Sequence, residues 1–235
     1  MLFREDVILI LAAIIPAVVL LLYVYRKDRL EKEPTKLLLR LVLWGIVSTA
    51  MAAATETVGD NILSALFNES SLAYRFLLYF VVVAVSEEGF KFLMLKWKTW
   101  RNPEFNCQFD GIVYAVFVSL GFALWENIHY VISYGMATAI ARALTAIPGH
   151  ACFGVFMGVF YGAAKRAVLA GNERHSRILR KAAVIVPSIL HGAYDFFATS
   201  LSEGDAGIFI LFVIVFFLAA FRVVKKEASN DRYIS

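Results

Sequence analysis

The sequence predicts an all-α bundle of transmembrane helices that forms one domain over residues 1–235. Three observations predict this fold class. First, 60% of the residues are hydrophobic and the mean hydropathy is +0.69, whereas soluble domains are nearer half apolar. Second, seven apolar stretches are long enough to cross about 30 Å of hydrocarbon. Third, the basic residues fall almost entirely on one side of those stretches.

The predicted spans follow one another through short polar connectors. A span needs about 20 apolar residues. The spans cover residues 7–25, 38–57, 73–95, 110–133, 144–164, 182–200 and 207–224. The first span runs on to Tyr25 with no small-residue cleavage site after it, so we expect a retained anchor and not a signal peptide.

The basic residues predict the orientation of the bundle, because Lys and Arg collect in cytoplasmic loops. With the N-terminus outside, all of the 23 basic residues except Arg4, Arg75 and Arg142 lie on the inner side. We therefore expect the N-terminus outside and the C-terminus in the cytoplasm. Contact with anionic membrane lipid accounts for the net charge of +4, so no nucleic-acid partner is expected.

The span 38–57 carries one acid, Glu56, near its outer end, where we expect a solvated carboxylate at the membrane surface. The span 73–95 carries two adjacent acids, Glu87 and Glu88. An ionised side chain at the bilayer centre costs about 3 kcal/mol. Such acids therefore usually face a partner, a cavity or a reaction.

Lys91 follows Glu87 by four residues and Glu88 by three, so on a helix its ammonium reaches either carboxylate. One lysine neutralises only one of the two acids. The other must then hold a proton, bind a metal or accept hydrogen bonds from another group. A carboxylate in that condition is suited to act as a general base.

The spans 110–133 and 144–164 add Glu126 and His150. An alternative for Glu126 is a lone acid that is hydrogen-bonded to a neighbouring helix. The helix after His150 has a glycine at every fourth position, a spacing that allows another helix to approach closely. These glycines are Gly154, Gly158 and Gly162.

The span 182–200 carries His191 and Asp195, one helical turn apart. The carboxylate is placed to select the tautomer of the imidazole ring or to join it as a ligand. A His–Asp pair by itself is commonly structural. Acids and a second histidine on neighbouring spans favour a functional role for this pair.

These motifs resemble those of the PrsW family of bacterial intramembrane proteases, within the superfamily that includes the CAAX prenyl proteases. They occur in order along most of the chain: Asp28-Arg29-Leu30-Glu31-Lys32-Glu33-Pro34, Glu87-Glu88-x-x-Lys91, Phe109-Asp110-Gly111, Phe122-x-x-x-Glu126-Asn127, Pro148-Gly149-His150 and His191-x-x-x-Asp195. In the CAAX relatives the residue at the Glu126 position is His and that at the Asp195 position is Asn. Both departures fit the PrsW branch.

The resemblance implies a protease domain in a bacterial cell membrane that cleaves a single-pass membrane protein. The typical substrate is an anti-sigma factor, cut on its outward-facing side in the first of two cleavages that release a transcription factor. We expect Glu87 or Glu88 to take a proton from water, Lys91 to set the charge of the pair, and Asp195 to belong to the catalytic group.

Two assignments remain open for the polar residues of the later spans. They ligate a Zn²⁺ ion that polarises the scissile carbonyl, since two histidines and a carboxylate are a common catalytic zinc set. Alternatively, they bind the substrate and the oxyanion in a metal-free site of glutamate type. These residues are Glu126, His150 and His191.

Two other functional classes compete with a protease. A proton- or ion-coupled transporter also uses acids and histidines inside the membrane. It predicts a polar path to both faces and often an internal repeat, and the sequence shows neither clearly. A non-enzymatic scaffold for a partner helix has no use for so many ionisable groups at membrane depth.

Overall fold

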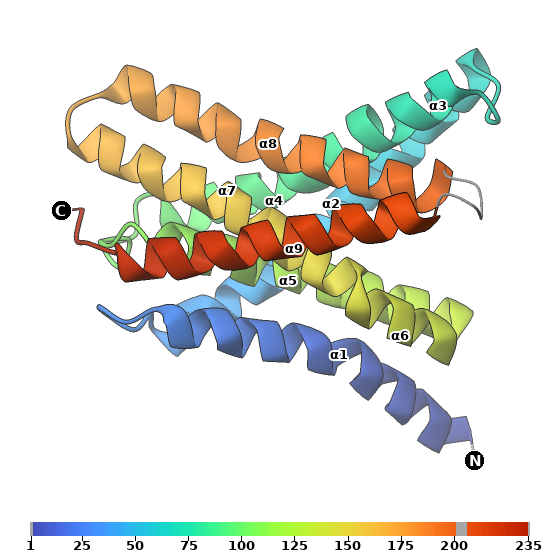
Figure 1. The fold of residues 1–235 in the computed structure, drawn as a ribbon, viewed down its shortest axis with the longest axis horizontal. Helices are drawn as coiled ribbons and strands as arrows, with labels where there is room; N and C mark the ends of the chain where they lie inside the picture. The colour runs from blue at the N-terminus through green and yellow to red at the C-terminus, as the bar shows by residue number, and fades with distance from the viewer. Residues whose placement is uncertain (1, 201–205, 235) are drawn as a thin grey trace.

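The structure is a computed structural model that describes residues 2–200 and 206–234 (Figure 1). The all-α class is confirmed, and no strand longer than the isolated bridge between Cys107 and Tyr233 forms within these ranges. The elements are α1 (Leu2–Lys27), α2 (Thr35–Leu66), α3 (Leu72–Leu77), η1 (Leu78–Val83), α4 (Ala84–Thr99), α5 (Asp110–Tyr134), α6 (Met136–Leu144), α7 (Ala146–Leu169), α8 (Glu173–Ser200) and α9 (Ala206–Ser229).

Six helical segments of the described residues are long and apolar enough to cross a membrane, and they coincide with six of the predicted spans. The remaining predicted span, 73–95, is the continuous helical run of α3, η1 and α4. The ends of the chain lie at opposite ends of the bundle (Figure 1), as an odd number of crossings requires. The protein is therefore a multi-pass membrane protein, and which end faces outward stays a prediction.

Local sequence sets several helix boundaries. Pro34 immediately precedes α2, where its missing N–H costs no helical hydrogen bond. Gly135 has a φ of 81° and separates α5 from α6, and Gly171 has a φ of 79° in the turn between α7 and α8. Glycine adopts this left-handed conformation at little cost. The sequence predicts a connector over 134–143, whereas the structure forms the short helix α6 there.

The end of the bundle that carries the C-terminus, here called the loop end, is closed by contacts between connectors (Figure 1). The backbone N–H of Ile234 donates to the carbonyl of Asn106 over 2.8 Å. Beneath lies a layer of buried side chains that we call the apolar floor. It comprises Leu95, Phe105, Ile112 and Tyr161, each at most 2% exposed. The floor separates the loop end from the polar groups at Glu87, Glu88 and Lys91.

Buried acids fix the connector after α1 to the start of α5. The Tyr114 hydroxyl donates to Glu33 over 2.6 Å, and the Cys107 backbone N–H donates to Asp110 over 2.7 Å. Burial away from water raises the pKa of Asp28 to about 6 and that of Glu33 to about 7. The first and third family motifs therefore meet in space at the loop end.

Helix α7 packs on α5 through its glycine face, as the four-residue spacing predicts. A Cβ added at Gly158 stands 2.4 Å from the Cα of Ile112, and one added at Gly162 stands 2.3 Å from the carbonyl of Gln108. Backbone atoms do not move aside as a flexible side chain does. The close approach holds α7, and His150 at its start, in a defined position against α5.

Gly158→Ala is expected to lower the free energy of unfolding by about 1–3 kcal/mol, because the added methyl group overpacks a backbone contact. Thermal unfolding in detergent measures this loss. Gly207→Ala is the matched control, since a Cβ at that glycine meets no atom of the described residues within 4 Å. Equal melting temperatures for the two variants would contradict the packing described here.

Candidate active site

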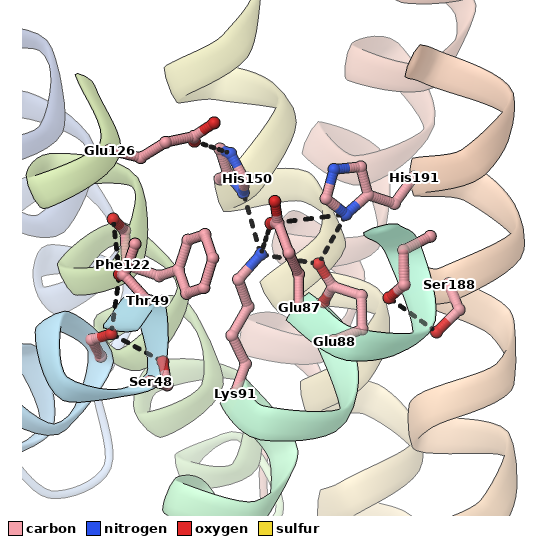
Figure 2. Close-up of polar contacts among 12 residues, drawn as sticks. Ser48, Thr49, Glu87, Glu88, Lys91, Phe122, Glu126, His150, Ser188 and His191 are labelled. Carbon is pink, nitrogen blue, oxygen red and sulfur yellow. Dashed lines mark hydrogen bonds and ion pairs between the residues drawn. The ribbon is translucent and has the colours of Figure 1, made fainter. Parts of the chain in front are cut away.

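Lys91 lies at the centre of a polar cluster inside the bundle (Figure 2). Its ammonium is fully buried and donates to Glu87 Oε2 over 2.9 Å and to Glu88 Oε1 over 2.8 Å. Both contacts follow from the helical spacing on α4. The ring of Phe122 lies 4.0 Å from the Nζ atom of Lys91 and shields it on one side. In this low-dielectric setting the charges attract strongly.

Helix α8 brings His191 against the same carboxylates. Its Nδ1 atom lies 3.1 Å from Glu88 Oε1 and 3.8 Å from Glu87 Oε2, and its Nε2 atom lies 3.3 Å from Asp195 Oδ2. Phe153 stacks on the imidazole ring with centroids 4.5 Å apart. With Nε2–H directed at Asp195, Nδ1 presents a lone pair toward the two glutamates.

Helix α7 supplies His150, which joins Lys91 to Glu126. The Nδ1 atom of His150 lies 3.1 Å from Lys91 Nζ, and its Nε2 atom lies 2.9 Å from Glu126 Oε2. An ammonium only donates hydrogen bonds. Nδ1 must therefore accept, and Nε2–H donates to Glu126. Hydrogen bonding thus assigns His150 the Nε2-protonated tautomer.

Two residues outside the sequence-derived set complete this region. Arg142 on α6 places Nη2 3.0 Å from Glu126 Oε2, and its Nε–H donates to Asn127 Oδ1 over 2.9 Å. The sequence predicts Arg142 only as a cation of an outer loop. One feature of the sequence could have singled out Arg142: it is one of few basic residues on the outer side of the bundle. Glu56, expected to be solvated at the surface, instead lines the same cavity as Glu126.

Two adjoining cavities give access to the cluster. One of about 430 Å³ is bordered by Arg142, His150, His191 and Asp195. The other, of about 320 Å³, lies between α2 and α5. Glu87 lines both cavities, whereas Glu88 is fully buried behind it. The two adjacent acids therefore differ in access to water and substrate.

Three donor atoms in the described part of the chain are close enough to share a metal ion, from Glu87, Glu88 and His191. One of the two assignments made from the sequence has Glu126, His150 and His191 as the metal ligands. Of these three, only His191 belongs to the trio of close donor atoms. The trio fits a divalent ion in two further respects. Glu88 Oε2 is buried and has no hydrogen-bond partner among the described side chains. The far nitrogen of His191 faces a carboxylate, as in many histidine ligands.

Comparisons with known proteins show the family of the chain. Residues 33–221 match the family described as PrsW family intramembrane metalloprotease. Protease PrsW of Geobacillus kaustophilus is 36% identical over 227 residues, covering 95% of this chain and 94% of the relative. Protease PrsW of Bacillus subtilis is 35% identical over 197 residues, covering 83% and 84%. Protease PrsW of Clostridioides difficile is 33% identical over 225 residues, covering 93% and 90%.

A helical membrane bundle with carboxylates, histidines and a lysine around a cavity, together with these relatives, defines an intramembrane protease. No solved structure matches the chain. The chain belongs to the PrsW family of intramembrane metalloproteases.

Proposed function

We propose that the protein hydrolyses a peptide bond of a single-pass membrane protein close to the outer membrane surface. One observation carries this proposal: the buried Glu87–Glu88–Lys91–His191 cluster borders a cavity in the half of the bundle away from the loop end. With the predicted orientation, that half faces outward. The family resemblance suggests an anti-sigma factor as the substrate and a site-1 cleavage.

Glu87 is the carboxylate best placed to activate water. Its partners in the described ranges, Lys91 and His191, lie on Oε2, which leaves Oε1 to accept a proton from a water in the cavity. The protonated acid can then give that proton to the leaving amine. Glu88, fully buried, accepts a hydrogen bond from Lys91 and lies 3.1 Å from Nδ1 of His191, and it thereby positions both side chains.

Charge that develops on the scissile carbonyl requires a donor inside the cavity. Arg142 and His150 both line it, and both contact Glu126. Glu126 therefore holds the two groups in place, and Arg142 is the cation available to face an oxyanion. Asp195 acts through His191 by keeping its Nε2 atom protonated.

The residues that would hold a divalent ion are Glu87, Glu88 and His191, and zinc accepts both carboxylate oxygen and imidazole nitrogen as ligands. When bound, the ion lowers the pKa of water and polarises the scissile carbonyl. Lys91 balances part of the negative charge of the two carboxylates.

Removal of metal is expected to abolish cleavage of a single-span reporter by the purified protein, and added Zn²⁺ is expected to restore it. Reporter cleavage on gels and metal content are measured on the same samples. Activity that survives complete removal of metal would reject the zinc assignment and leave a glutamate-type site. Failure of the untreated protein to cleave any single-span reporter would reject the proposed function itself.

A further inference from the structure

Helices α2 and α5 run in the same direction and pack closely where a glycine of each helix meets the backbone of the other. A Cβ added at Gly45 stands 2.1 Å from the Val118 carbonyl, and one added at Gly121 stands 2.2 Å from the Val42 carbonyl. One turn further on, the Thr49 hydroxyl donates to the Phe122 carbonyl over 3.3 Å. From Thr49 onward, the cavity of about 320 Å³ lies between the two helices.

This cavity forms a cleft between the two helices that leads to the catalytic cluster. Ala53 and Glu56 line it from α2, Trp125 and Glu126 line it from α5, and Glu87 closes its inner end. Trp125 is 53% exposed, so the mouth of the cleft opens on the membrane-facing surface of the bundle. The cleft thus offers a sideways route from the membrane to Glu87, between α2 and α5.

Glu56 differs from the other two acids of the cleft. Lys91 contacts Glu87 over 2.9 Å, and Arg142 contacts Glu126 over 3.0 Å. No basic side chain of residues 7–199 and 206–234 lies within ion-pair distance of Glu56, and its Oε1 atom is buried without a hydrogen-bond partner. Glu56 is therefore the one acid of the cleft whose partner is missing from the surrounding side chains.

A carboxyl oxygen that is buried without a hydrogen-bond partner is costly unless the group holds a proton or meets a donor. A cation is the partner that satisfies it best, because a buried charge needs an opposite charge and good hydrogen bonds. The cleft volume is roughly ten times the ~30 Å³ that one water occupies in the liquid. It therefore accommodates a side chain as long as lysine or arginine.

We propose that the cleft between α2 and α5 receives the substrate and that Glu56 binds a lysine or arginine side chain near the scissile bond. This inference rests on the proposed proteolytic function and adds a specificity determinant to it. Glu56 lies 11 positions after the Gly45 contact, about 16 Å along the helix at 1.5 Å per residue. The basic residue of the substrate is thus held on the cavity side of the contact between Gly45 and α5.

The test uses three single-span reporters that are identical except for Lys, Gln or Glu beside the scissile bond. We expect the unchanged enzyme to cleave the Lys reporter at least about 10-fold more efficiently than the Glu reporter, mainly through KM. Glu56→Gln is expected to bring the two within about 2-fold, and Glu56→Lys to reverse the preference. Glu69→Gln, at an exposed position, is the control.

A Glu56→Gln enzyme that keeps the full preference for Lys would overturn the proposal. So would a Glu56→Lys enzyme that still prefers Lys. Thermal unfolding of each variant shows whether it remains folded. If Glu56→Lys does not fold, the uncharged Glu56→Gln variant takes its place in the test. These readouts concern the ratio between reporters, so a general loss of activity does not produce them.

Binding separates this inference from the proposed function. Cross-linking of the Lys reporter to Glu88→Gln enzyme is compared with that to the Glu56→Gln/Glu88→Gln double variant. At least a 10-fold loss of cross-linking in the double variant supports the cation site, even if no reporter is cleaved. Absence of cleavage in that case rejects only the proteolytic function. Equal cross-linking overturns the cation site and leaves proteolysis standing.

Discussion

Glu87→Gln is expected to reduce kcat for reporter cleavage by about 10²- to 10⁴-fold, the contribution typical of general acid–base catalysis. Glutamine has nearly the shape of glutamate but does not take a proton from water. Because Glu87 lines the cavities and Lys91 keeps its contact with Glu88, the fold should survive. Reporter cleavage and thermal unfolding are measured on the same preparation.

Glu88→Gln is expected to lose activity to a similar extent but also to lower the melting temperature. Glu88 is fully buried, and its Oε1 atom contacts both Lys91 and His191. Removing one partner of a buried ion pair costs about 3–5 kcal/mol. Glu69→Gln, an exposed acid between α2 and α3, is the control for both variants. Full cleavage by either active-site variant would contradict the assigned roles.

His191→Ala is expected to lose both cleavage and bound metal. The affinity for the metal should fall by at least about 100-fold, which is more than is typical for residues that only support a ligand. His191 belongs to the trio of close donor atoms. Metal content after dialysis and reporter cleavage measure the two effects. His175→Ala is the control, because His175 is exposed on α8 far along the chain from the cluster.

His150→Ala distinguishes the two possible donor sets. If Glu87, Glu88 and His191 hold the ion, this variant loses cleavage, because Glu126 and Lys91 lose their link, but it retains metal. If Glu126, His150 and His191 hold the ion, as the sequence analysis allows, metal is lost as well. Retention of metal by His191→Ala would contradict both sets.

The fold was largely predictable because a membrane span needs a long apolar stretch, whatever its neighbours are. Helix α2 nevertheless extends from Thr35 to Leu66, beyond the predicted 38–57. Polar residues such as Asp60 end an apolar stretch but not a helix. The π-helical turn η1, just before Glu87, has no signal in hydropathy. Such turns often occur at functional sites.

The site was only partly predictable, because contacts within one helix follow from spacing and contacts between helices do not. Lys91 reaches Glu87 and Glu88 as expected for residues on α4. The pairing of His150 with Glu126 depends instead on how α7 packs against α5. The sequence therefore identified the polar residues at depth, but not which of them share a partner.

The apolar floor has a consequence for the energetics of the cell. A hydrolase must admit water to its site, and a water-filled passage through a membrane protein would let protons cross. Leu95 follows Lys91 by one helical turn and is fully buried, and Tyr161 and Phe105 stack beside it with centroids 5.2 Å apart. Neither of the cavities that reach Glu87 is lined by any of these residues. A buried layer at this depth would keep the water that the enzyme admits to its site from forming a path for protons across the membrane.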